Sequence, residues 1–104
     1  MYNIIYILYM DFEANISNIF DAIKEVLLYK NKNYGNSALS PKNIFYKGDA
    51  KNAILIRLDD KLCRIIANKN NEPRVNDVCD IIGYLALLLV NMNVKVEDIL
   101  KLKD

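Results

Sequence analysis

Four charged side chains between positions 57 and 64 have the spacing of one helical face. At about 100° per residue, Arg57, Lys61 and Arg64 fall within one arc. Asp60 falls within the same arc, whereas Asp59 lies away from it. Guanidinium and ammonium groups arranged in this way bind phosphate oxygens. The alternative is a ladder of weak surface ion pairs, which is the simpler interpretation for this helix taken alone.

Two acids follow, one helical turn apart. Asp77 and Asp80 share a face with Tyr84, and Asp80 lies at the edge of a long apolar run. A carboxylate in that position is costly unless it is paired with a cation, hydrogen-bonded or bound to a metal. Two interpretations remain open here. One is an ion pair with Arg57 or Arg64, and the other is a site for Mg²⁺, which prefers oxygen ligands.

A third candidate region surrounds a glycine. Gly35 can adopt a positive φ and expose backbone N–H groups to an anion. Lys30, Asn36 and Ser37 lie close to it in sequence, and Tyr34 is suited to stacking on a base. The alternative is an ordinary glycine-terminated helix with lysines at the negative end of its dipole.

The composition excludes several kinds of chemistry. With 14 basic and 13 acidic residues the net charge is +1, so the chain lacks the footprint of a general nucleic-acid binder. It has no histidine, which rules out histidine acid–base catalysis and the usual serine triads. Cys63 and Cys79 lie in apolar helical runs. We expect buried, reduced thiols in a cytoplasmic protein, not a disulfide or a zinc site.

Helices must position these residues, and the chain has the pattern for them. A first helix is predicted from about Asp11 to Lys32, with acids near its start and lysines near its end. The preceding residues 1–10 are apolar, too short to span a bilayer and unlike a signal peptide. They either join this helix or form a short strand. The apolar positions of the helix are Ile16, Ile19, Phe20, Ile23, Val26 and Leu27.

Breaks in the pattern divide the rest of the chain. A short helical turn is predicted over 41–46, after Ser40 and Pro41, and Asp49 can cap the next helix. The longer helices are predicted over 50–67, 75–91 and 96–101, with a turn at 91–93. The core face of the 50–67 helix is predicted to be Ile54, Leu55, Leu58, Leu62 and Ile65.

The fold class follows from these elements. We predict one all-α domain, a small bundle of about four helices. Residues 1–10 and the run from Ile81 to Val90 should be buried within protein. Hydrophobic residues make up 53% of a chain of only 104 residues, so we also expect a homodimer or higher oligomer.

Three segments in this order resemble a phage and prophage family. They read KNKNYGNS at 30–37, IRLDDKLCR at 56–64 and DVCDIIGYL at 77–85. They are similar to the pattern of the nucleotide modification associated domain 1 group and its short phage relatives, over roughly residues 28–90. That family in turn distantly resembles the MazG-type all-α nucleotide pyrophosphohydrolases.

The resemblance implies a Mg²⁺-dependent site. By position, Asp77 and Asp80 match one acidic pair of the MazG-type enzymes, and Asp60 stands near the other. These three aspartates would hold the metal and direct water at a nucleotide phosphate. The chain departs from the enzyme pattern at Arg57 and Lys61, which stand where the enzymes carry carboxylates. Extra cations favour direct phosphate contact over metal binding.

Three functions are therefore weighed. The first is a Mg²⁺-dependent nucleotide pyrophosphohydrolase, favoured by a small margin. The second is a non-catalytic binder that sequesters a nucleotide-derived immune signal, with Tyr34 or Tyr84 stacking on the base. The third is a structural or interaction module whose charged face is a salt-bridge network between packed helices. In the first two, the phosphate-binding cations are Arg57, Lys61 and Arg64, with Lys30 beside the glycine turn.

Overall fold

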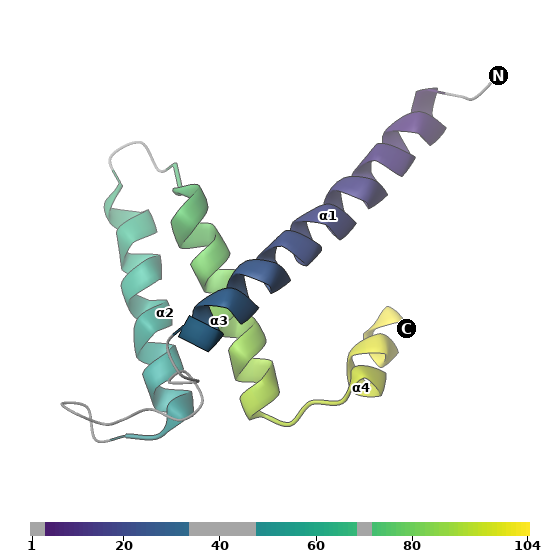
Figure 1. The fold of residues 1–104 in the computed structure, drawn as a ribbon. Helices are drawn as coiled ribbons and strands as arrows, with labels where there is room; N and C mark the ends of the chain where they lie inside the picture. The colour runs from purple at the N-terminus through teal and green to yellow at the C-terminus, as the bar shows by residue number, and fades with distance from the viewer. Residues whose placement is uncertain (1–3, 34–47, 69–71) are drawn as a thin grey trace.

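The computed structural model describes residues 4–33, 48–68 and 72–104. Within these ranges the chain forms four α-helices and a final 3₁₀ helix, with no strand, which confirms the predicted all-α fold (Figure 1). The helices are α1 (Ile4–Asn33), α2 (Ala50–Ala67), α3 (Val75–Asn91) and α4 (Val96–Leu100), followed by η1 (Lys101–Lys103). The predicted turn over 41–46 lies outside the described residues.

Helix α1 is longer than the sequence pattern suggested. It begins at Ile4, so the apolar N-terminal segment joins the helix and does not form a strand. Of the two alternatives for this segment, joining the helix is thus confirmed from Ile4 onward, and Asp11 and Glu13 lie inside the helix and do not mark its first turn. The helix ends at Asn33 with Lys30 and Lys32 in its last turn, where cations favour the dipole.

Helices α2 and α3 have the predicted bounds. Asp49 caps α2, since its side chain accepts a hydrogen bond from the backbone N–H of Asn52 at 2.8 Å. Helix α3 starts after Pro73 and Arg74, and its N-cap residue, Arg74, makes no side-chain capping bond. The cap at Asp49 therefore sets the residue at which α2, the helix that carries the charged residues, begins.

A Schellman turn ends α3. Asn93 has a φ of 57°, a left-handed conformation that asparagine tolerates better than most residues. The N–H of Asn93 donates to the carbonyl of Val90 at 3.0 Å, and the N–H of Val94 donates to that of Leu89 at 3.3 Å. This turn redirects the chain into α4, in agreement with the predicted break at 91–93.

The packing centres on α2 and α3. These two helices lie side by side and form the larger contact, while α1 crosses α3 with its C-terminal part (Figure 1). The buried apolar residues of the described chain are Ala50, Ile54 and Leu58, all on α2, and Ile54 is only 1% exposed. The enclosed core is therefore small for a chain of this hydrophobicity.

Several residues expected in the core are exposed. On α2, Leu55 and Leu62 lie outside the packed face, because α3 covers a narrower arc than the apolar pattern suggested. On α3, no described element covers the side chains toward its end, so the predicted burial of the run from Ile81 to Val90 was wrong for Leu85, Leu89 and Val90. The described side chains among residues 1–10 are also exposed in the single chain, since α1 extends beyond α3 there.

The overall shape is extended. The radius of gyration is 17.1 Å, whereas about 13 Å is typical of a compact domain of 100 residues. The principal extents are 61 × 40 × 29 Å. Among the described helices, none alone has the length and apolarity needed to cross a membrane. The pair formed by α3 with the segment Val96–Lys103 passes the same test but is bent by 120°.

Candidate functional site

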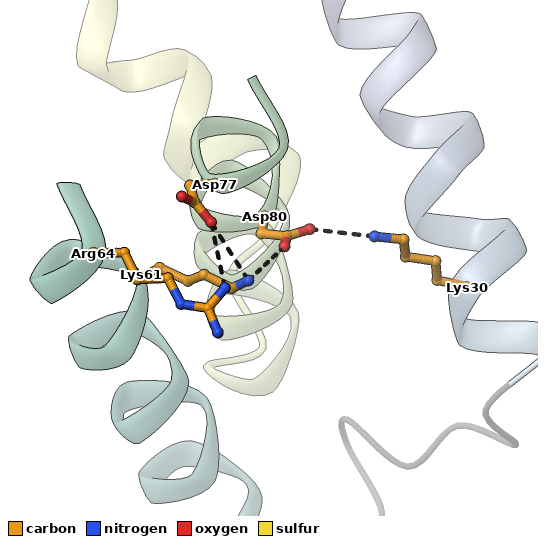
Figure 2. Close-up of polar contacts among 5 residues, drawn as sticks. All are labelled: Lys30, Lys61, Arg64, Asp77 and Asp80. Atoms are coloured by element: carbon orange, nitrogen blue, oxygen red, sulfur yellow. Dashed lines mark hydrogen bonds and ion pairs between the residues drawn. The ribbon is translucent and has the colours of Figure 1, made fainter. Parts of the chain in front are cut away.

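Five charged residues from three helices form an ion-pair network (Figure 2). Helix α3 supplies the two acids, and α1 and α2 supply the cations. We use the name ion-pair network for these residues only: Lys30, Lys61, Arg64, Asp77 and Asp80. It contains three cations and two carboxylates, so it carries one excess positive charge.

Lys61 lies at the centre of the network. Its Nζ is 2.9 Å from Oδ2 of Asp80 and 3.7 Å from Oδ1 of Asp77, so one ammonium group contacts both carboxylates (Figure 2). Arg64 contacts the same oxygen of Asp77 through Nη1 at 3.7 Å. Lys61 is only 15% exposed at its side chain, because it lies beside the buried face formed by Ile54 and Leu58.

Lys30 connects α1 to the network. Its Nζ donates to Oδ1 of Asp80 at 3.3 Å, so Asp80 is held by a cation on each side. The sequence suggested Arg57 or Arg64 as the partner of Asp80, and that was wrong. Lys61 is closer to the helix seam than either arginine, and Lys30 reaches Asp80 only because α1 crosses α3.

Asp77 is the most buried polar residue of the described chain, at 6% exposure. It lies in the first turn of α3, where the positive end of the helix dipole stabilises a carboxylate. Asp80 follows one turn later on the same face. The local fold of α3 thus presents two acids to α2, and the cations of α2 make their burial tolerable.

The electrostatics of the network favour the charged forms. Burial alone would raise the pKa of Asp80, but hydrogen bonds from Lys61 and Lys30 outweigh it and hold that pKa below its ordinary value of 3.8. The hydrogen bond to Asp80 raises the pKa of Lys61 above 10.5, despite its partial burial. Asp80 and Lys61 are therefore both ionised at neutral pH.

A pocket of about 560 Å³ lies between α1, α2 and α3, next to the network. This volume is within the roughly 300–1,000 Å³ that is typical of small-molecule sites. Its walls combine two kinds of side chain. The polar ones are Lys30, Asn31, Arg57, Asn76, Asp80 and Tyr84. The apolar ones include Ile23, Val26, Leu27, Ile54 and Leu87.

Arg57 is a cation of the pocket that does not belong to the ion-pair network. It lines the cavity from α2 and is exposed. In the described part of the chain, the ion pairs of the site involve Lys30, Lys61 and Arg64, and none involves Arg57. Its guanidinium group is therefore available to an anion that enters the pocket.

The remaining predicted residues divide into three groups. Tyr84 lines the pocket, as the stacking hypothesis requires. Asp60 is exposed on α2 and belongs neither to the ion-pair network nor to the pocket lining, because Lys61 and not Asp60 faces the seam with α3. The four residues of the glycine turn lie outside the described residues: Tyr34, Gly35, Asn36 and Ser37.

Sequence reasoning did not identify several pocket residues. Asn31 and Asn76 are polar wall residues whose neighbours, Lys30 and Asp77, were singled out in the sequence. Gly83 and Cys79 line the pocket from α3, and Leu27 lies 3.5 Å from where a Cβ on Gly83 would stand. For Asn76, Cys79 and Gly83 the signal is their phase on α3, since they share its pocket-facing side with Asp80, whereas Asn31 is marked only by its place next to Lys30 on α1.

The donor set fits a magnesium ion poorly. Asp77 and Asp80 are the two carboxylates close enough to share a ligand, and both are already in contact with Lys61. Within the described ranges, no group of three His, Cys, Asp or Glu residues is placed to hold a metal. A divalent ion at this position would have to displace the ammonium group of Lys61.

Both cysteines are free thiols. Cys63 is exposed, so its predicted burial was wrong: it lies half a turn of phase away from Ile54, on the outer side of α2. Cys79 is partly buried in the wall of the pocket. The two thiols therefore lie in different environments, one exposed to solvent and one in the pocket wall.

No protein-family model matches the chain, and no curated protein or solved structure is significantly similar to it. The kinship with the phage group and with the MazG-type enzymes thus remains a prediction from the three sequence segments.

Proposed function

We propose that this chain is a nucleotide-binding protein that holds a phosphate group at Arg57 without hydrolysing it. The observation that carries the proposal is the position of Arg57, which lines a pocket of ligand size and has no acidic partner in the described residues. A planar guanidinium group in such a place suits bidentate contact with phosphate oxygens.

The rest of the pocket supports a nucleotide over a simple anion. Tyr84 offers an aromatic face on which a base can stack, and the aliphatic side chains of Ile23 and Leu27 line the wall contributed by α1. Asn76 can provide hydrogen bonds to the polar edge of a base or to a sugar. A ligand with one charged end and one flat, weakly polar end matches these walls.

Binding is favoured over hydrolysis by the state of the acids. Asp77 and Asp80 are neutralised by Lys61, so they are poor ligands for Mg²⁺ and poor bases for water. Asp60, the third acid of the hydrolase hypothesis, is exposed and apart from them. The ion-pair network instead fixes the three helices that form the walls of the pocket.

Calorimetric titration tests this proposal. The full chain is titrated with mono-, di- and triphosphate nucleotides and with cyclic nucleotides, each with and without Mg²⁺. We expect tight binding of at least one of them that does not need the metal. Arg57→Ala should weaken it by about ten- to a hundredfold, the usual effect of losing a charged hydrogen bond.

The matched control is Arg74→Ala, which removes an exposed arginine outside the pocket. It should leave the affinity unchanged. Release of phosphate or pyrophosphate in the presence of Mg²⁺ would favour the hydrolase instead. If no nucleotide binds, and if Arg57→Ala changes nothing measurable, the charged face is a structural module and the proposal fails.

The cellular setting belongs to the same proposal. The free thiols Cys63 and Cys79 suit the reducing cytoplasm. If the resemblance to the phage group holds, a binder without turnover would act by sequestering a nucleotide-derived signal of host immunity. Tight binding of a cyclic nucleotide over its linear form in the titration above would support that role.

A further inference from the structure

The part of α1 from Leu8 to Phe20 carries an apolar surface that no other described element covers. Five large side chains follow each other at helical spacing and are between 42% and 62% exposed. We call them the apolar stripe: Leu8, Phe12, Ile16, Ile19 and Phe20. They fall within an arc of about 120°, so they form one continuous face.

This face continues the one that docks on α3. Farther along α1, Ile23 and Leu27 are partly buried, and Leu27 lies next to Gly83 of α3. The helix then extends past α3 toward its N-terminus, and no other described element lies along that part (Figure 1). The helix has 30 residues, or about 45 Å of length.

We propose that the apolar stripe packs against the same stripe of a second copy of this chain. The enclosed core of the described residues consists of Ala50, Ile54 and Leu58, too little to stabilise a domain of this size. A second copy supplies the missing apolar contact with a face of equal length, and an isologous pair uses the same patch twice.

The available area suits such a contact. Phe12 and Phe20 alone expose on the order of 200 Å² of aromatic surface. The other residues of the stripe, together with the flanks of the helix, bring the surface toward the roughly 800 Å² per partner of a stable interface. Exposed apolar patches of this extent are uncommon in monomers.

The charges on the helix favour a protein partner over a lipid surface. From Ile4 to Phe20 the helix contains no lysine or arginine, and it carries Asp11 and Glu13. Helices that lie on membranes are usually rich in basic residues, which anionic lipids attract. A second copy needs no such attraction, because the contact is apolar.

Sedimentation equilibrium on the full chain tests the proposal. We expect a mass of two chains or a multiple of it, with the variant Phe12→Glu/Ile16→Glu shifted toward the monomer. Its dissociation constant should rise by at least about tenfold for each buried charge. The matched control, Ser17→Glu/Asn18→Glu, adds the same charges on the polar side of the same turns and should leave the mass unchanged.

A second measurement uses the unmodified chain, in case the stripe variant does not fold. Because association stabilises only the folded state, the melting temperature should rise with protein concentration. A monomer at every concentration with a constant melting temperature would overturn the proposal. So would equal disruption by the control variant, or a monomer that binds vesicles of anionic phospholipid.

Discussion

Lys61 illustrates how one side chain determines the character of the whole site. It occupies the seam between α2 and α3 and contacts both acids of the network. A lysine there occupies the two carboxylates that could otherwise share a metal ion and makes them part of a structural contact between helices. Arg57, at the neighbouring pocket, has no acidic partner in the described residues, which is why we propose phosphate binding without hydrolysis at this site.

Because the pKa of Asp80 is lowered in the folded protein, the free energy of unfolding depends on pH at acidic pH. Between its ordinary pKa of 3.8 and its lower pKa in the folded protein, the unfolded chain binds more protons than the folded chain. Stability that is present above pH 3.8 is therefore lost as the pH falls through the folded-state pKa. Lys61 acts at the alkaline end of the pH range. Its contribution to stability is lost as the pH rises through its folded-state pKa, which lies above 10.5.

Asp80→Asn should remove the part of the stability that is lost in acid. The variant should be less stable at neutral pH by about 2 kcal/mol, because Lys61 and Lys30 lose their charged partner. Its stability should also fall less steeply below pH 3.8 than that of the unmodified chain. Urea denaturation over a pH series measures both effects. Asp59→Asn, at an exposed aspartate outside the network, is the control, and an unchanged acid slope in Asp80→Asn would contradict the assignment.

Cys79 provides a direct probe of the pocket. It lies in the pocket wall, whereas Cys63 is exposed on the outer side of α2. A nucleotide found to bind by calorimetry should slow the reaction of Cys79 with a thiol reagent, about a hundredfold at a hundred times its dissociation constant. Labelling of the Cys63→Ser variant isolates Cys79. Protection of Cys63 in the Cys79→Ser variant instead would place the ligand elsewhere.

At the scale of the elements, Gly83 is where α1 meets α3. A Cβ there would lie 3.5 Å from Cδ1 of Leu27, an ordinary van der Waals distance. Gly83→Ala should therefore fit, and it should stabilise α3 by up to about 1 kcal/mol because glycine is a poor helix former. Gly83→Leu should instead push α1 away and disrupt the pocket.

Chemical denaturation measures the stability of Gly83→Ala, and nucleotide titration measures the loss of the pocket in Gly83→Leu. Val78→Leu changes a more exposed position of the same helix outside the pocket; it should leave nucleotide binding unchanged and raise stability by less than about 0.5 kcal/mol, the smaller propensity difference between valine and leucine. Loss of stability in Gly83→Ala would show that α1 packs closer to α3 than described.

The helix boundaries were predictable where a local signal marks them. Asp49 caps α2, and the bounds of both α2 and α3 agree with the sequence pattern. The start of α1 was not predictable from its acids, because Asp11 and Glu13 imitate an N-terminal turn inside a longer helix. Which charged residues share one face of a helix was also predictable, since this depends only on the 3.6-residue period.

The site was predictable only in part, because its partners come from different helices. The sequence suggested a salt-bridge network between packed helices, but it assigned the wrong cation to Asp80. It had no means of placing Lys30 beside Asp80, a contact that joins residues fifty positions apart. The pocket depends on how α1 crosses α3, which no local pattern specifies.

At the scale of the whole molecule, α1 has two parts with different surroundings. Its C-terminal part forms a wall of the pocket, and its N-terminal part carries the apolar stripe. The high hydrophobic content predicted an oligomer, but the pattern alone did not show which surface would mediate it. The apolar stripe of α1 is the surface that we propose for it, because no other described element covers that part of the helix.

The pairing of α2 with α3 also has a kinetic consequence. These two helices are joined through residues 68–74, so their contacts close only a short loop, whereas α1 reaches α3 across the much longer separation between Lys30 and Asp80. Short loops cost less entropy to close, and chains with local contacts fold fastest. The α2–α3 hairpin should therefore form first during refolding, with both acids already neutralised by Lys61. Docking of α1 follows as a later step, and that step completes the pocket.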